Sequence, residues 1–250
     1  MADLFAYLKW RGDLSFTNSP LNQIDALILS QLSYINFSGI ISELPRKQKS
    51  LKQVATEFSN HQEKDSRSNL GLVINPKTID LLQEAANTPR FSNIQLCNYK
   101  DSFNPNIEEQ FCAITALLDD DSAVVIFRGT DDSIVGFKED FKLAYLDVIP
   151  SQTLALNYFK QAEKELKGDF IIAGHSKGAN QAMFVAVNVD KKIQNKISAV
   201  YNLDGPGFSE EFYQRESFKN IQDKLYSFYP YFSVVGMIFN HPVNYQIVKS

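Results

Sequence analysis

One stretch of the sequence, residues 170–187, reads FIIAGHSKGANQAMFVAV. Its first four residues are wholly apolar, which is typical of a short strand buried on both faces of a sheet. The segment 179–189 is expected to form a helix. Between the two lies GHSKG, residues 174–178, which matches the pattern Gly-x-Ser-x-Gly. The stretch therefore predicts a strand, a tight turn and a helix in succession, the repeating unit of α/β folds.

The same alternation of strands and helices extends along the chain. Two strand-like runs, 111–118 and 123–127, flank the polar residues 119–122 and predict an antiparallel hairpin. Strands that alternate with helices imply a mostly parallel central sheet with helices on both faces. We further expect strands at 197–203, 225–229 and 245–248, and helices at 21–35, 51–58, 76–86, 152–166 and 210–221.

The composition is that of a globular protein, with 44% hydrophobic and 22% charged residues. The net charge of −4 offers no basic excess for phosphates, so we expect no nucleic-acid partner. We expect no signal peptide and no integral membrane segment, because the longest membrane-like run, 231–239, is far shorter than the ~20 apolar residues of a spanning helix. Cys97 and Cys112 fit neither a disulfide framework nor a zinc site, which favours small buried side chains and a cytoplasmic location. The oligomeric state stays open.

Ser176, at the centre of GHSKG, is the predicted nucleophile. In this turn the serine Oγ projects above the edge of the sheet, where a substrate can reach it. Glycines at 174 and 178 remove Cβ atoms that would collide across the turn. A purely structural glycine–serine turn is the alternative, but the strand before it and the helix after it favour a nucleophile. The motif in this setting predicts an α/β-hydrolase-like fold, as a single domain over 1–250 whose N-terminal helical portion, 1–100, packs on a core of 101–250.

Asp204 is the predicted acid that would orient a catalytic histidine. It follows the strand 197–203 directly, so it should lie at the same sheet edge as Ser176. The glycines and proline of residues 205–207 could hold its carboxylate in a sharp turn. An Asx-turn or a cap for the next helix is the alternative role for this aspartate.

Three histidines are available as a base. His61 precedes the serine in a polar loop, and we expect it to be solvated. His175 is the sequence neighbour of the nucleophile, so its side chain should diverge from the serine Oγ. His241 alone follows Asp204 and is the candidate base, although in this fold the histidine usually follows the last strand rather than preceding it. A structural or surface role for His241 is the alternative, and we predict that its ring is not within hydrogen-bonding distance of Ser176 Oγ.

The oxyanion hole should combine two backbone N–H groups, those of Lys177 and Thr130. Gly129 permits an unusual backbone conformation in the loop after strand 123–127, and the Thr130 hydroxyl could add a donor. The alternative is a plain loop in which Arg128 pairs with a nearby carboxylate. For the charged side chain of Lys177 we expect a solvated position, with only its amide in a functional role.

Carboxylates also cluster at 119–121, 131–132 and 139–140, without histidine or cysteine partners. Such groups serve loops and helix caps more often than metal ions. The sequence contains no glycine-rich phosphate loop and no dinucleotide fingerprint. We therefore expect neither a metal nor a cofactor.

Two motifs, IFRGTD at 126–131 and GHSKG at 174–178, resemble the Mbeg1-like family, whose members are α/β-hydrolase relatives close to the class 3 lipases. The similarity extends along the chain through YLKWRGD at 7–13, NQIDAL at 22–27, GFKEDF at 136–141 and SVVGM at 233–237. It implies an intracellular acyl hydrolase with Ser176 as nucleophile and Thr130 and Lys177 at the oxyanion hole. Relatives continue past the strand that resembles 245–250 into a segment with a histidine, so either His241 is the base or this chain lacks the catalytic histidine.

These observations predict a serine hydrolase, esterase- or lipase-like, that cleaves a small-molecule carboxylic ester through an acyl-enzyme at Ser176. The alternative is a non-catalytic binding protein on the same scaffold without a functional base. A histidine nitrogen within hydrogen-bond reach of Ser176 Oγ would discriminate between the two. The aromatic side chains of 208–239 could form an acyl pocket, but core packing is the expected use.

Overall fold

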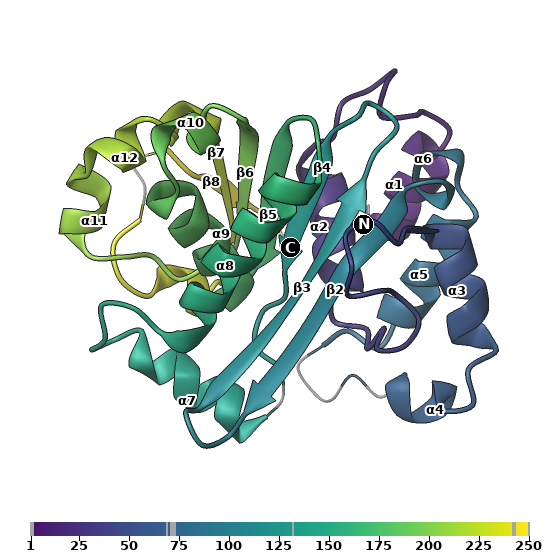
Figure 1. Cartoon of the computed structure of the whole chain (residues 1–250), viewed down its shortest axis with the longest axis horizontal. Coiled ribbons are helices and arrows are strands. Elements are labelled where there is room, and N and C mark those ends of the chain that lie inside the picture. Colours follow the sequence, from purple (N-terminus) through teal and green to yellow (C-terminus); the bar gives the residue numbers. More distant parts are fainter. Residues whose placement is uncertain (1–2, 69, 71–73, 132, 242–243, 250) are drawn as a thin grey trace.

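The computed structural model describes residues 3–68, 70, 74–131, 133–241 and 244–249. Within these residues, eight strands form one sheet in the order β1 to β8 (Figure 1). Neighbours from β1 to β4 pair antiparallel and neighbours from β4 to β8 pair parallel. The predicted α/β class with a mostly parallel sheet is confirmed. The strands are β1 Lys49–Ser50, β2 Gln95–Asn104, β3 Glu109–Leu117, β4 Ala123–Phe127, β5 Phe170–His175, β6 Ile197–Leu203, β7 Leu225–Pro230 and β8 Gln246–Val248.

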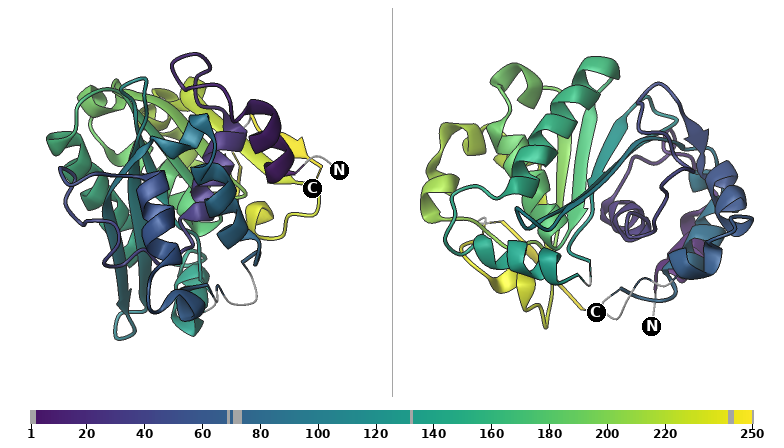
Figure 2. Two further views of the ribbon diagram at one scale, coloured as in Figure 1. Left: turned by 90° about the vertical axis from the view of Figure 1, so that its right-hand side faces the viewer. Right: turned by 60° about the horizontal axis from the view of Figure 1, so that its bottom comes forward.

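Helices cover both faces of this sheet, as expected (Figure 2). The N-terminal helices α1 to α6 lie on one side, and α8 and α9 lie on the other. In the part of the chain that is described, the α-helices are α1 Leu4–Arg11, α2 Gln23–Leu32, α3 Leu51–Ser59, α4 Lys64–Arg67, α5 Thr78–Ala86, α6 Pro89–Ser92, α7 Ile134–Lys142, α8 Pro150–Glu165, α9 Lys177–Asn188, α10 Lys191–Gln194, α11 Glu210–Gln214 and α12 Glu216–Lys219.

The sheet separates two hydrophobic cores, and strand β5 contributes to both. Ile171 and Ala173 join the core beneath the N-terminal helices, whereas Phe170 and Ile172 join the core beneath α8 and α9. Successive side chains of a strand point to opposite faces, so a strand with helices on both sides needs apolar residues at every position. This is why the run 170–173 is wholly apolar.

Three features differ from the sequence expectations. Strand β2 was not predicted, because its second half is polar and partly exposed. Helix α7 was not predicted either, although it follows the loop of the candidate oxyanion hole. The helix expected at 210–221 is broken at Arg215, whose extended backbone (φ −61°, ψ 140°) ends α11 before α12 begins. The predicted hairpin is confirmed, with Leu117 opposite Ala123.

The parallel strands β4 to β7 end at a common edge of the sheet, and the candidate catalytic residues follow these ends. Both cysteines, Cys97 and Cys112, are buried and unpaired, as expected. None of the helices within the described ranges combines the length and apolar character needed to cross a bilayer.

Candidate active site

Ser176 lies in a strained backbone conformation between β5 and α9. Its φ of 56° and ψ of −130° fall in a region that non-glycine residues rarely occupy. Strain of this kind costs about 1–3 kcal/mol and concentrates at functional sites. The flanking glycines make the turn possible: a Cβ on Gly174 would lie 2.2 Å from the carbonyl oxygen of Gly178, and a Cβ on Gly178 would lie 2.1 Å from that of Phe127. The turn predicted from GHSKG is present, with the serine at its tip.

The loop after β4 packs directly against this turn. A Cβ on Gly129 would lie 2.6 Å from the His175 carbonyl oxygen and 3.1 Å from Ser176 Cβ, so only glycine allows this approach. The backbone N–H groups of Thr130 and Lys177 donate no hydrogen bond to any residue that the structure describes. Backbone amides without an internal acceptor, close to a serine nucleophile, are the usual donors to an oxyanion in acyl-transfer enzymes.

Arg128 forms the ion pair that was the alternative interpretation of this loop, and this ion pair does not exclude an oxyanion hole at the same loop. Its guanidinium donates to the Asp101 carboxylate at 3.1 and 3.4 Å and lies 3.9 Å from Asp131. This ion pair holds the start of the loop against β2. The close approach of Gly129 to Ser176 occurs one residue later, so both descriptions of the loop apply.

The expectation that the Lys177 side chain is solvated is wrong. Its ammonium group is buried and donates to Glu139 Oε2 at 2.7 Å, to Gln110 Oε1 at 2.8 Å and to the Gln110 carbonyl at 3.0 Å. The error has a physical cause. A lysine is buried only where several acceptors converge, and these come from β3 and from the unpredicted helix α7.

The carboxylates at 139–140 were expected to lie in loops or to cap helices, but in the structure they bind side chains next to the candidate site. Glu139 holds Lys177, and Asp140 Oδ2 accepts a hydrogen bond of 2.6 Å from the Thr130 hydroxyl. Burial raises the pKa of Asp140 above its ordinary value, while the nearby Lys177 charge and the Thr130 hydrogen bond act in the opposite direction. Asp132 lies outside the described residues. Among the residues that are described, no group of three or more potential ligands could hold a metal ion.

Asp204 lies at the carboxyl end of β6, one strand from Ser176. Its carboxylate accepts a hydrogen bond from the Ser233 hydroxyl, which in turn accepts one from the Gly236 amide at 2.9 Å. Burial raises its pKa, and the Ser233 hydrogen bond, the charge of His175 and the Gly236 amide lower it. It does not cap the next helix, because Ser209 occupies that position. The carboxylate is thus held by the segment that follows β7.

His175 diverges from the nucleophile, as its position in a strand requires. Its Nδ1 shares a hydrogen bond of 2.9 Å with the Tyr34 hydroxyl, on the face covered by the N-terminal helices. Burial lowers the pKa of His175, although the Asp204 carboxylate raises it. Tyr34 touches the site from 95 residues before Gly129: its hydroxyl would lie 2.2 Å from a Cβ on that glycine. No motif in the sequence marked Tyr34.

His241 is not joined to the other candidate residues. Its ring packs edge-on against Tyr229 at 5.1 Å between centroids, and both ring nitrogens are buried without a hydrogen-bond partner among the described residues. Burial lowers the pKa of the ring, and the Met237 backbone acts in the opposite direction. Strand β8 pairs with the last residues of β7, 228–230, and the segment before it lies beside residues 207–208, where Asn240 forms an antiparallel bridge with Phe208. No hydrogen bond links His241 to Ser176 Oγ in this structure, as the chain order led us to expect.

The aromatic segment 208–239 divides between core and surface. Phe212 and Phe218 are buried in the core beneath α9, which agrees with the expected packing role. Tyr231 and Phe232 are 71% and 82% exposed, close in sequence to the residues that hold Asp204. The packing expectation therefore holds for only the first part of the segment.

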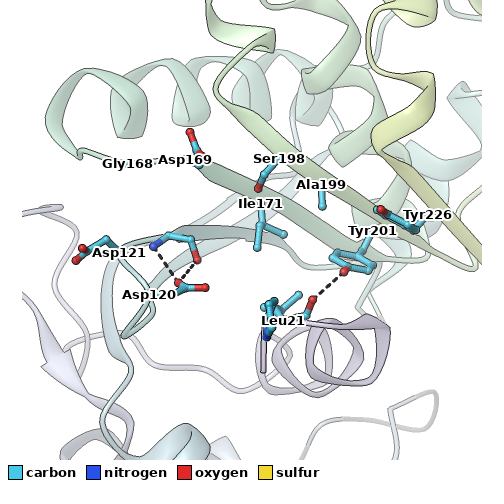
Figure 3. A pocket seen from close by; sticks show the side chains of 12 residues that line it. Leu21, Asp120, Asp121, Gly168, Asp169, Ile171, Ser198, Ala199, Tyr201 and Tyr226 are labelled. Atoms are coloured by element: carbon cyan, nitrogen blue, oxygen red, sulfur yellow. Dashed lines mark hydrogen bonds between the residues drawn. The ribbon is translucent and has the colours of Figure 1, made fainter. Parts of the chain in front are cut away.

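A separate hollow of about 560 Å³ lies where the parallel strands begin (Figure 3). Asp120 and Asp169 line it, together with Tyr201, whose hydroxyl donates to the Leu21 carbonyl at 3.1 Å. Ser176 follows the opposite ends of these strands, so the hollow takes no part in the candidate site.

Comparison with known proteins adds the family. The model of the Mbeg1-like family matches residues 85–250. The chain belongs to the Mbeg1-like family. The matched range contains Ser176, Thr130, Lys177 and Asp204, whereas Tyr34 lies before it. No curated protein matches the chain.

Proposed function

We propose that this Mbeg1-like chain is a serine hydrolase with an α/β-hydrolase architecture that cleaves small-molecule carboxylic esters in the cytoplasm. The observation that carries the proposal is the backbone of Ser176, held at φ 56° between two glycines that tolerate no side chain. A structural turn has no need of this strain in a serine, whereas a nucleophile does, because the strain projects Oγ out of the sheet edge.

In the proposed reaction, Ser176 Oγ attacks the acyl carbonyl carbon and its proton passes to a base. The amides of Thr130 and Lys177 donate to the oxygen that becomes negative in the tetrahedral intermediate. The alcohol then leaves with a proton, and water hydrolyses the acyl-serine by the same steps. Preorganised donors of this kind are worth about 10²–10³ in kcat each.

The acid and base of this proposal are Asp204 and His241. For His241 to accept the serine proton, its ring must leave Tyr229 and approach Oγ, since no hydrogen bond joins them in the structure. A serine without an aligned base keeps only the contributions of the oxyanion hole and of binding, about 10³–10⁴ over water. We therefore expect slow turnover from the chain in the arrangement described.

A fluorophosphonate probe tests the nucleophile directly. We expect Ser176 to be labelled, with the modified peptide identified by mass spectrometry, and the Ser176→Ala variant to remain unlabelled. Ser122→Ala, which alters a serine in the loop between β3 and β4, is the matched control and should label like the wild type. Equal labelling of Ser176→Ala would contradict the proposal.

One observation favours a second candidate, a non-catalytic binding protein on this scaffold. Neither ring nitrogen of His241 forms a hydrogen bond with Ser176 or Asp204 in the described part of the chain. Hydrolysis of p-nitrophenyl acetate distinguishes the two candidates. An enzyme requires a rate that falls to background in Ser176→Ala, whereas equal rates in the two proteins would favour the binding protein.

A further inference from the structure

Helix α7 contacts both candidate oxyanion-hole residues through neighbouring carboxylates. Glu139 accepts a hydrogen bond from the Lys177 ammonium at 2.7 Å, and Asp140 accepts one from the Thr130 hydroxyl at 2.6 Å. Gly136, one turn earlier, packs so closely on Thr130 that a Cβ there would lie 2.8 Å from its methyl group. The same short helix therefore holds the two chain segments that supply the two free amides.

The ion pair between Glu139 and Lys177 is fully hydrogen-bonded and buried from solvent. Both side chains are at most 1% exposed, and all three ammonium hydrogens have acceptors. Glu139 also accepts from the backbone N–H of Ser151 at 2.9 Å and of Gln110 at 3.2 Å. A buried ion pair seldom stabilises a fold more than apolar side chains of similar size would. Its place, one residue after the nucleophile, is therefore better explained by the geometry that it fixes.

The burial of Asp140 is even harder to explain by fold stability alone than that of the Glu139–Lys177 pair. Its Oδ2 is bonded to Thr130, but its Oδ1 is buried without a partner among the residues described. A buried carboxylate oxygen without a partner costs free energy. The contact it provides fixes the side chain of Thr130, and with it the orientation of the adjacent backbone.

We propose that α7 is a clamp that sets the separation between the Thr130 and Lys177 amides, with Glu139 and Asp140 as positioning residues. The inference rests on the proposed hydrolase function and assigns to it residues that do not touch substrate. The two amides belong to different loops, and misplacement of a reacting or stabilising group by about 1 Å can cost 10²-fold in rate. A helix bonded to both loops limits that misplacement.

The test compares rates of fluorophosphonate labelling, because the phosphonyl oxygen occupies the oxyanion hole as Ser176 attacks phosphorus and fluoride leaves. We expect Glu139→Gln to lower kinact by about 10- to 100-fold while KI stays near the wild-type value, since positioning acts on the transition state. Glu108→Gln is the matched control. Glu108 also pairs with α7, through Lys142 at 2.9 Å and Lys138 at 3.4 Å, but contacts neither amide segment. Its kinact should equal that of the wild type.

A double variant separates positioning from folding. Lys177→Met with Glu139→Gln removes both charges of the buried pair but keeps a side-chain oxygen that can accept from the Ser151 or Gln110 backbone N–H, which a leucine at 139 would leave unpaired. We expect the melting temperature of this double variant to stay close to that of the wild type while kinact remains low. Wild-type kinact in a folded Glu139→Gln protein, or in the double variant, would overturn the clamp. If the wild type itself is labelled no faster than Ser176→Ala, the proposed function fails instead.

Discussion

The two halves of the candidate site differ in how completely they are assembled. The nucleophile half comprises the ends of β4 and β5, α7 and the start of α9; the acid half comprises the ends of β6 and β7 and residues 231–241. In the nucleophile half, the Lys177 ammonium has three acceptors, and Gly174 and Gly178 lie so close to neighbouring backbone that an added Cβ would clash. In the acid half, Asp204 is held by Ser233, but both nitrogens of His241 lack a partner among the described residues.

The difference shows that stabilising an oxyanion and moving a proton depend on separate parts of this fold. The nucleophile half is built from buried side chains on β3, α7 and α9, so its geometry is fixed by packing. The acid half depends on a segment with exposed aromatic residues and with Phe239 at φ 66°, an uncommon conformation for a bulky side chain. We infer that the proton relay, rather than the oxyanion hole, limits the rate of this chain.

The largest expected effect is on the acid half. Provided that His241 joins Asp204 and Ser176 during turnover, Asp204→Asn should lower kcat for a p-nitrophenyl ester by on the order of 10⁴, because a histidine without its carboxylate partner adopts the wrong tautomer. Circular dichroism and the melting temperature should be close to those of the wild type. A loss of less than tenfold would leave Asp204 with a structural role and would show that the acid half contributes little to catalysis.

The nucleophile half should respond to packing instead. Gly178→Ala places a Cβ 2.1 Å from the Phe127 carbonyl oxygen, so we expect the free energy of unfolding to fall by about 1–3 kcal/mol. Labelling of Ser176 should be lost with it, because the turn must open. Gly39→Ala adds a Cβ that meets no atom within 4 Å but holds alanine at φ 77°, so it measures backbone strain without a steric clash. An unfolding free energy of Gly178→Ala equal to that of the wild type, with labelling retained, would show that the turn tolerates a side chain.

The smallest effect concerns pH and the histidine between the halves. Burial lowers the pKa of His175 below that of the unfolded chain, so the unfolded state binds the proton more readily. Stability from this group is present above about pH 6.5 and is lost as the pH falls through the folded pKa. His175→Asn keeps an acceptor for Tyr34 and cannot titrate, so its unfolding free energy, measured in urea, should fall less steeply with acidification. His241→Asn, at a more exposed site, should flatten the profile less; the reverse order would contradict the assignment.

The sequence alone was sufficient for the parts of this protein that depend on local pattern. An apolar run, a glycine turn and a helix are contiguous in the chain, so the order of elements around Ser176 and the α/β class could be predicted from 170–187. The position of Asp204 followed from strand order, since parallel strands end at a shared edge. Steric restrictions in a turn act over a few neighbouring residues, and the edge at which a parallel strand ends follows from the order of strands and helices. Both can be predicted from the sequence.

Tertiary structure alone decided which side chains meet. The sequence predicted a solvated side chain for Lys177, but in the structure Glu139 and Gln110, from two other elements, accept hydrogen bonds from its buried ammonium group. Tyr34 reaches His175 across 141 residues, and no pattern of spacing marks such a contact. His241 lies in the predicted order but not in contact with Ser176. The burial and pairing of a charge depend on neighbours brought together by packing, and those neighbours are not encoded near it in the chain.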